Sequence, residues 1–276
     1  MSGDVRGNVK RQNAGGVEIN YFEGGDGPDL VLLHGMFGDY LDWEPVLGLL
    51  AERFHVVAPD LPGFGESEKP DVAYSGEFFV ESLDALFAAI GLQEMVLAGN
   101  SFGGQIAMLY ALRHPEKVSQ LVLVDSGGFR EVPEGERAMA RTILSRENLL
   151  KMPPAMIPLI FSKVFVKESV EKERYLAKQT AKLKAGDYAE YVRALVRSID
   201  LSMATNLLEE LGKIKCPVLL ISGKEDSVVP REQAEEAARR LPAARLEVME
   251  KCGHMPQLEE AGEFATLVMK QVSKKQ

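Results

Sequence analysis

The sequence predicts an α/β fold in which a mostly parallel sheet is interrupted by one helical insertion. Three observations support this prediction. Short apolar runs typical of buried strands alternate with segments of helical spacing up to residue 125, the alternation stops over residues 127–212, and it resumes at residue 216. We therefore divide the chain into a core of residues 1–126 and 213–276 and an inserted helical segment of residues 127–212.

The expected elements follow one another in a regular order. Apolar and partly β-branched runs indicate strands, and apolar residues at helical spacing indicate helices. The expected strands are 17–23, 29–35, 54–60, 95–98, 118–125, 216–223 and 245–250, and the expected helices of the core are 77–90, 105–113, 231–241 and one from about 259. Inside the insertion we expect helices over 134–151, 168–184 and 187–199, with prolines as breaks.

Composition places the chain among ordinary globular proteins. It has 276 residues, with 46% hydrophobic and 26% charged residues. The net charge of −9 and the pI near 5.2 argue against nucleic acid or an anionic membrane surface as the main partner. We see no apolar leader and no run long enough to cross a bilayer, so we expect a cytoplasmic protein. Nothing in the sequence decides between a monomer and a homo-oligomer.

The two cysteines, Cys216 and Cys252, are too few for a disulfide framework or a zinc cluster. We interpret both as reduced packing residues. Cys252 lies two residues from His254, so an effect of that ring on the thiol stays open.

The predicted chemistry is centred on Ser101. Residues 99–103 read Gly-Asn-Ser-Phe-Gly, a G-x-S-x-G motif between an expected strand and an expected helix. A serine on so tight a turn has strained backbone angles, and the flanking glycines let strand and helix pass without a Cβ clash. The hydroxyl then stands at the helix N-terminus. The alternative is an ordinary turn with an inert serine, but the strand before it and the helix after it favour a nucleophile.

A serine hydroxyl needs a base, and the chain has four histidines. His55 lies inside a strand, His114 ends a helix before a proline, and His34 is expected to hold the loop after its strand by hydrogen bonds. His254 remains, in a loop between the last expected strand and the last helix. An isolated loop histidine is usually a surface residue, but combined with the Ser101 motif it is the predicted base.

The carboxylate that orients the base should end another strand, between the serine and the histidine in the sequence. Asp125 and Asp226 both meet this condition. Asp226 follows Gly223 in a turn after a buried strand, whereas Asp125 is followed by Ser126 and the start of the insertion, as a turn-capping residue would be. We prefer Asp226, although chain geometry alone excludes neither residue. Asp60 precedes the serine and is expected to hold the loop that follows it.

Two backbone amides are expected to stabilise an oxyanion. One is that of Phe102, the residue after the nucleophile. The other should come from the loop His-Gly-Met-Phe-Gly-Asp that follows the first buried parallel strand, where Gly35 lets the chain reverse so that the amide of Met36, or alternatively that of Phe37, faces Ser101. The competing interpretation of this loop is a plain β-turn.

The order of these motifs resembles one family. Strand-His34-Gly35, the loop 60–67 (Asp-Leu-Pro-Gly-Phe-Gly-Glu-Ser), residues 99–104, Gly223-x-x-Asp226 and Gly253-His254 are together similar to the α/β-hydrolase fold family, in its serine-nucleophile, carboxylesterase-like branch. The resemblance covers nearly the whole chain. It implies an eight-stranded, mostly parallel, doubly wound sheet, a Ser-Asp-His triad, and a helical cap after the sixth strand that matches residues 127–212. The serine departs from the related haloalkane dehalogenases and epoxide hydrolases, which place aspartate there, and argues against both activities.

We therefore predict a hydrolase that cleaves a small-molecule carboxylic ester through an acyl-enzyme, with no metal or organic cofactor. Phe37, Asn100 and Met255 adjoin the predicted catalytic residues and are candidates for substrate binding. Apolar residues of the insertion are expected to roof a pocket for a small to medium apolar acyl group, although packing of the insertion on the core must account for most of them. They are Met139, Ile143, Leu144, Met152, Met156, Ile157, Leu159, Phe161 and Phe165.

Other activities remain open. Asn100 and the segment 252–259 (Cys-Gly-His-Met-Pro-Gln-Leu-Glu) are similar to the meta-cleavage-product hydrolases, which cleave a carbon–carbon bond. Against this, the first loop lacks their glycine-proline-rich form, and Met255 stands where they usually carry tryptophan. Thioester or lactone hydrolysis would use the same residues. A receptor that only holds a small ligand would not need Ser101, Asp226 and His254 together.

Overall fold

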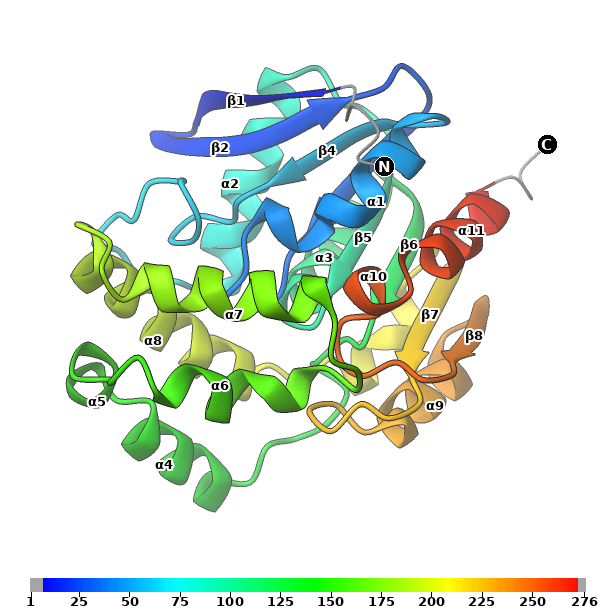
Figure 1. Cartoon of the computed structure of the whole chain (residues 1–276). Coiled ribbons are helices and arrows are strands. Elements are labelled where there is room, and N and C mark those ends of the chain that lie inside the picture. Colours follow the sequence, from blue (N-terminus) through cyan, green and yellow to red (C-terminus); the bar gives the residue numbers. More distant parts are fainter. Residues whose placement is uncertain (1–6, 273–276) are drawn as a thin grey trace.

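The computed structural model describes residues 7–272, and its centre is an eight-stranded sheet (Figure 1). The strands lie in the order β1-β2-β4-β3-β5-β6-β7-β8. The first two pairs in this order, β1–β2 and β2–β4, are antiparallel, and the remaining five pairs are parallel. The predicted mostly parallel α/β fold is confirmed. The strands are β1 (Gly7–Ala14), β2 (Val17–Gly24), β3 (Asp29–Leu33), β4 (His55–Pro59), β5 (Met95–Asn100), β6 (Val118–Val124), β7 (Val218–Gly223) and β8 (Ala244–Met249).

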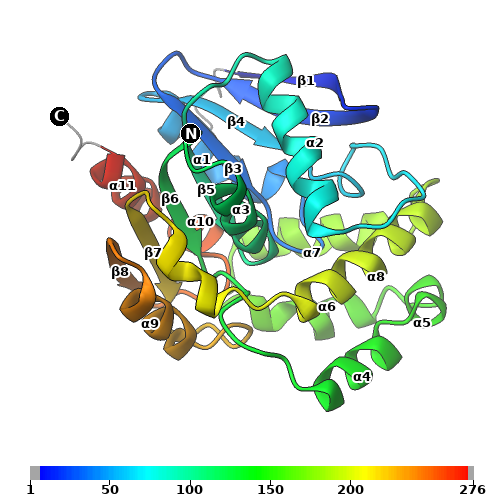
Figure 2. The same cartoon turned by 180° about the vertical axis from the view of Figure 1, so that it is seen from behind.

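The central strands are apolar along their whole length because helices cover both faces of the sheet. In β3, Leu30 and Leu32 belong to one hydrophobic cluster and Val31 and Leu33 to another. This is the two-residue period of a strand with both faces buried. Figures 1 and 2 show the two layers from opposite sides. One layer contains α1 (Glu44–Ala51) and α11 (Ala261–Val272), and the other contains α2 (Gly76–Ala89), α3 (Phe102–Arg113) and α9 (Arg231–Arg240).

The sheet begins earlier than the sequence indicated. We expected the first strand at residue 17, but β1 precedes it and pairs with β2 along its full length. Five of the eight residues of β1 are exposed, so this edge strand lacks the apolar alternation that would reveal it. The last expected helix is also two helices, α10 (Pro256–Glu259) and α11.

Between β6 and β7 the described chain forms only helices and connecting loops. They are α4 (Glu134–Ile143), α5 (Arg146–Leu150), α6 (Met156–Phe161), η2 (Ser162–Val164), α7 (Val170–Lys182), α8 (Tyr188–Ala204) and η3 (Leu208–Lys213). The helix expected over residues 134–151 is broken because Ser145 starts a new one, its hydroxyl accepting from the amide of Asn148. Figures 1 and 2 show α4 to α8, which we call the inserted helices, grouped on one side of the sheet. Within residues 7–272, every helix is too short or too polar to cross a bilayer.

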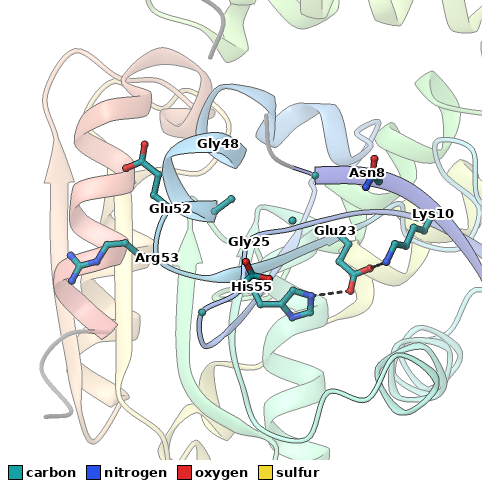
Figure 3. A pocket seen from close by; sticks show the side chains of 13 residues that line it. Asn8, Lys10, Glu23, Gly25, Gly48, Glu52, Arg53 and His55 are labelled. Atoms are coloured by element: carbon teal, nitrogen blue, oxygen red, sulfur yellow. Dashed lines mark hydrogen bonds and ion pairs between the residues drawn. The ribbon is translucent and has the colours of Figure 1, made fainter. Parts of the chain in front are cut away.

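A hollow lined by residues of β1, β2, β4 and α1 lies far from the predicted chemistry (Figure 3). His55, the first residue of β4, lies there with its Nε2 2.9 Å from Glu23 and its Nδ1 2.7 Å from Asp29. Burial lowers the pKa of His55, but the hydrogen bonds to these two carboxylates outweigh it and the net shift is upward. His55 is therefore held in place by two acids, and it lies at the amino end of the parallel strands, away from Ser101.

This cluster predicts a pH-dependent contribution to stability. Because the folded pKa of His55 is raised, the contribution is fully present below the ordinary value of about 6.5 and is lost as the pH rises through the folded pKa. Replacing His55→Gln should lower the free energy of unfolding by up to about 1 kcal/mol near pH 6, since the ring is partly exposed to solvent, and by less near pH 9. Denaturant unfolding at both pH values measures the difference. A deficit that is the same at both would contradict the prediction, and His114→Gln is the control.

Candidate active site

Ser101 occupies a strained turn at the carboxyl end of the central strand. β5 ends at Asn100, Ser101 has φ 54° and ψ −113°, and α3 begins at Phe102. A positive φ is costly for any residue with a Cβ, by about 1–3 kcal/mol. With these backbone angles the chain leaves the strand at Ser101 and enters the helix at the next residue. Phe102, as the first helical residue, has no acceptor for its amide within α3.

Three glycines make this turn possible. A Cβ on Gly99 would lie 2.3 Å from the carbonyl oxygen of Gly103, and a Cβ on Gly103 would lie 2.3 Å from that of Leu33. A Cβ on Gly104 would lie 2.3 Å from the hydroxyl oxygen of Ser126. Gly99 and Gly103 therefore pack against backbone, and Gly104 packs against the side chain of Ser126 in the loop after β6.

His254 and Asp226 meet in a direct contact. Nδ1 of His254 lies 2.8 Å from Oδ2 of Asp226, and the two side chains are 9% and 0% exposed. Oδ1 of Asp226 accepts from the amides of Val228 at 2.7 Å and Val229 at 3.1 Å. Both carboxylate oxygens are thus engaged, and the side chain is fixed. Because Nδ1 faces the carboxylate, Nε2 is the ring nitrogen left for other partners.

Asn100 links this pair to the serine turn. Its side-chain Nδ2 donates to the carbonyl oxygens of Val124 and His254, each at 3.1 Å. The residue before Ser101 is therefore tied to the loop that carries His254. Sequence reasoning offered Asn100 as a substrate-binding residue, and the structure shows what its side-chain amide binds within the protein, namely these two backbone carbonyls.

The competing acid, Asp125, directly follows β6 at the same edge of the sheet. It has φ 41°, is 2% exposed, and accepts a hydrogen bond at Oδ1 from the amide of Gly223 at 2.9 Å. The imidazole contact belongs to Asp226. The two carboxyl groups and His254 offer atoms within 4.8 Å of one another, a grouping that can also hold a metal ion. However, two ligands of one metal, with bonds of roughly 2 Å, lie about 3 Å or more apart, so the 2.8 Å contact between Asp226 and His254 fits a hydrogen bond better.

The loop after β3 passes beside Ser101. The amide of Gly38 donates to the carbonyl of Gly35 at 3.1 Å, which closes a turn with Phe37 at φ 66°. A Cβ on Gly35 would lie 3.4 Å from the Cβ of Ser101, so the turn reaches the serine. The amides of Met36 and Phe37 belong to this turn. The loop has the form of a β-turn. Its position beside Ser101 makes the amides of Met36 and Phe37 candidates for donors to an oxyanion.

His34 and Asp60 hold the neighbouring loops, as the sequence predicted. The amide of Leu61 donates to Nε2 of His34 at 2.9 Å, so Nδ1 carries the proton and donates to the carbonyl of Gly35 at 2.8 Å. Burial lowers the pKa of His34, which keeps the ring neutral. Asp60 accepts from the amides of Tyr40 at 2.7 Å and Glu66 at 2.8 Å.

An inserted helix holds the same turn from the other side. From α7, Lys182 Nζ and Gln179 Nε2 donate to the carbonyl of Phe37 at 2.5 and 3.2 Å. Lys178 bridges Asp39 and Asp42 at 2.8 and 2.6 Å. Sequence reasoning missed these residues, because lysines spaced four apart on a helix normally indicate a solvated face. No signal in the sequence connects them to a loop some 140 residues earlier.

A narrow apolar cavity of about 30 Å³ lies between this turn and the inserted helices, and Phe37 lines it. Of the nine apolar residues expected to roof a pocket, four line this cavity, namely Leu144, Met152, Ile157 and Phe161. Phe165 and Met255 are buried in the cluster next to it. The other four are exposed, which are Met139, Ile143, Met156 and Leu159. The expectation that these nine residues roof a pocket is therefore wrong in part, since four of the nine side chains are exposed.

The chain contains two cysteines, Cys216 and Cys252. Neither forms a disulfide bond in the described part of the chain. Burial, together with nearby acidic groups, raises the pKa of Cys252 to about 12, so it stays protonated at neutral pH. This agrees with the interpretation of the cysteines as reduced residues.

The alpha/beta hydrolase fold family model matches residues 28–261, most of the chain. The chain belongs to the α/β-hydrolase fold family. The protein is a hydrolase, because it belongs to this family and because the similarity to the hydrolases described below extends over more than 90% of the chain.

Three similar proteins show the range of the family. A 2-hydroxymuconate semialdehyde hydrolase of Pseudomonas sp. strain CF600 is 31% identical over 261 residues, covering 92% of this chain and 90% of its own. Lipase 1 of Psychrobacter immobilis is 31% identical over 273 residues, which cover 91% of this chain and 80% of the lipase. Among solved structures, a bacterial membrane phospholipase A is 32% identical with a TM-score of 0.83, and the match covers 98% of this chain and 87% of the phospholipase.

The contacts of α7 predict a stability effect at the site. Burial works to raise the pKa of Asp39, but Lys182 and Lys178 outweigh it and hold that pKa far below its usual range. Replacing Lys178→Met leaves Asp39 and the fully buried Asp42 without their bridging cation, so the free energy of unfolding at pH 7 should fall by about 3 kcal/mol. Chemical denaturation measures it. Arg174→Met, an exposed cation of the same helix, is the control, and an equal effect in both would contradict the prediction.

Proposed function

We propose that the protein hydrolyses carboxylic esters, with Ser101 as nucleophile, His254 as base, and Asp226 as the acid that orients the base. The observation that carries the proposal is the buried 2.8 Å contact between His254 and Asp226, tied through Asn100 to the strained turn of Ser101. A buried carboxylate beside an imidazole fixes its tautomer and stabilises its charged form. An inert serine would need neither partner.

The proposed reaction runs in two halves. Ser101 Oγ attacks the ester carbonyl carbon while Nε2 of His254 takes the hydroxyl proton, and the amides of Met36 and Phe102 donate to the oxyanion. The carbon–oxygen bond to the leaving group then breaks, and the alcohol takes the proton from His254. Water, deprotonated by the same nitrogen, attacks the acyl carbon, and Ser101 leaves with that proton. The products are one acid and one alcohol, and no metal or organic cofactor takes part.

We assign substrate selection to residues 127–212, acting as a cap on the core formed by residues 1–126 and 213–276. The apolar lining of the cavity beside Phe37 favours an apolar acyl group. Its volume of about 30 Å³ is well below the roughly 300 Å³ of a typical ligand site, so the inserted helices must shift to admit substrate. α4 has no buried residue, so its movement would break few contacts.

The nucleophile is tested by labelling. Wild-type protein should react covalently with a fluorophosphonate probe, because an activated serine attacks it. Ser101→Ala should abolish labelling and lower kcat for an ester by roughly 10⁴- to 10⁶-fold while the protein stays folded. Intact mass spectrometry and circular dichroism provide both readouts. Ser227→Ala, in the loop beside Asp226, should label normally, and a labelled Ser101→Ala protein would disprove the assignment.

Carbon–carbon bond hydrolysis is the second candidate. The similarity to the 2-hydroxymuconate semialdehyde hydrolase and the polar residue Asn100 beside the serine favour it. The similarity to Lipase 1 and the phospholipase A favours ester cleavage, as do Met255 and the form of the loop after β3. Both reactions would use the same three catalytic side chains, so the choice depends on the pocket.

A substrate panel separates the two candidates. We expect measurable kcat/KM for nitrophenyl esters of short to medium straight acyl chains, decreasing for long or charged acyl groups because the cavity is narrow and apolar. Ring-fission dienoates should lose their colour slowly or not at all. Fast bleaching of a dienoate with negligible ester turnover would replace the ester proposal by the carbon–carbon one.

A further inference from the structure

Asp125 is a second buried carboxyl group at the proposed triad, and the mechanism above gives it no task. It lies at the end of β6, where it is 2% exposed. The side chain of Asp226 is 0% exposed, and Asp125, Asp226 and His254 each offer an atom that lies within 4.8 Å of the other two. Two carboxyl groups thus share one dry space behind His254, and two negative charges at that distance would repel each other strongly.

The hydrogen bonds of the two acids are unequal. Asp226 accepts from two backbone amides and faces the ring of His254. Asp125 accepts from the amide of Gly223 at Oδ1, while its Oδ2 is buried and has no hydrogen-bond partner among residues 7–272. An anion is stabilised by the donors that surround it. The negative charge therefore belongs on Asp226 and the proton on Asp125.

The surroundings of Asp125 agree with a neutral acid. The polar groups that face it are Ser222 and Gly223 of β7, Asp226 from the loop after β7, and His254 from the loop after β8. Burial and the charge of Asp226 raise the pKa of Asp125 well above its ordinary value. A carboxyl group that keeps its proton at pH 7 becomes a hydrogen-bond donor.

We propose that Asp125 is a positioning residue that stays protonated and donates a hydrogen bond to the carboxylate of Asp226, so that the base of the reaction is held by an acid pair instead of by one aspartate. The inference rests on the proposed function, since it concerns the base of that reaction. Its first consequence is that Asp125 moderates the charge which Asp226 presents to His254. Its second is that Asp125 can release its proton and replace Asp226 in part when that charge is removed.

The first experiment compares Asp125→Ala with Asp125→Asn. Alanine removes the donor, so the full charge of Asp226 stabilises the imidazolium and the acid limb of the kcat/KM profile should move upward by about one pH unit. Asparagine tolerates a positive φ, can accept from Gly223, and can donate to Asp226, so it should restore the wild-type profile. Asp200→Asn, at an exposed carboxylate, is the control. A profile that does not move in Asp125→Ala would overturn the inference.

The second experiment removes the charge of Asp226. In Asp226→Asn, Asp125 ionises more easily and lies near His254, so the loss in kcat should be roughly 10²-fold, smaller than the roughly 10⁴-fold loss of a triad with a single acid. Adding Asp125→Asn should then cost a further ~10²-fold, far more than the same change in the wild-type background. If the second substitution costs nothing in the Asp226→Asn background, Asp125 has only a structural role.

A readout independent of activity separates this inference from the proposed function. At pH 7 the infrared difference spectrum between wild type and Asp125→Asn should contain a carboxylic-acid C=O band that belongs to wild type. If the band is present in wild type and lost in Asp125→Asn, but wild type hydrolyses no substrate, the acid pair is retained and the esterase proposal is rejected. Ester hydrolysis without the band would retain the esterase and reject the acid pair. Because Asn fits the site, the measurement does not depend on whether Asp125→Ala folds.

Discussion

The positive φ of Ser101 is the constraint on which the rest of the site depends. It is tolerable only because residues 99, 103 and 104 have no Cβ, so that the start of α3 can pack closely against the backbone of β3 and the side chain of Ser126 after β6. This packing brings Gly35 beside the serine and sets Asn100 against the loop of His254. The energy for holding a strained residue comes from the buried strands around it, because a loop without such packing would relax.

The carboxyl edge of the sheet supplies the remaining groups by topology. Parallel strands all end at the same edge, so loops after β3, β5, β6, β7 and β8 converge although they are far apart in the sequence. Convergence has a cost, since it buries Asp125 and Asp226 next to each other. Backbone amides offset that cost for Asp226, and a retained proton relieves it for Asp125. The chemistry of the site thus follows from how each buried acid is neutralised.

The sequence predicted the core of this protein well, because buried parallel strands and tight glycine turns leave local patterns. Ser101, Asp226 and His254 each stand next to such a turn, which is why they could be named in advance. β1 escaped notice because an exposed edge strand has no apolar alternation. Lys178, Gln179 and Lys182 escaped because their partners are set by tertiary packing, which no local spacing encodes. The sequence favoured Asp226 without excluding Asp125, and the contacts of their oxygens in the structure distinguish the two.

The contrast between local sequence patterns and contacts set by tertiary packing also explains why the reaction type is easier to infer than the substrate. The groups that we propose to be catalytic belong to turns of the core, where backbone geometry dictates the residue. The groups that line the cavity belong to the inserted helices, where any apolar residue of suitable volume can pack. Yet the two parts are not independent, because α7 holds the carbonyl of Phe37 in the turn beside Ser101. A shift of α7 that admits substrate therefore also moves a proposed oxyanion donor, which couples substrate entry to the assembly of the site.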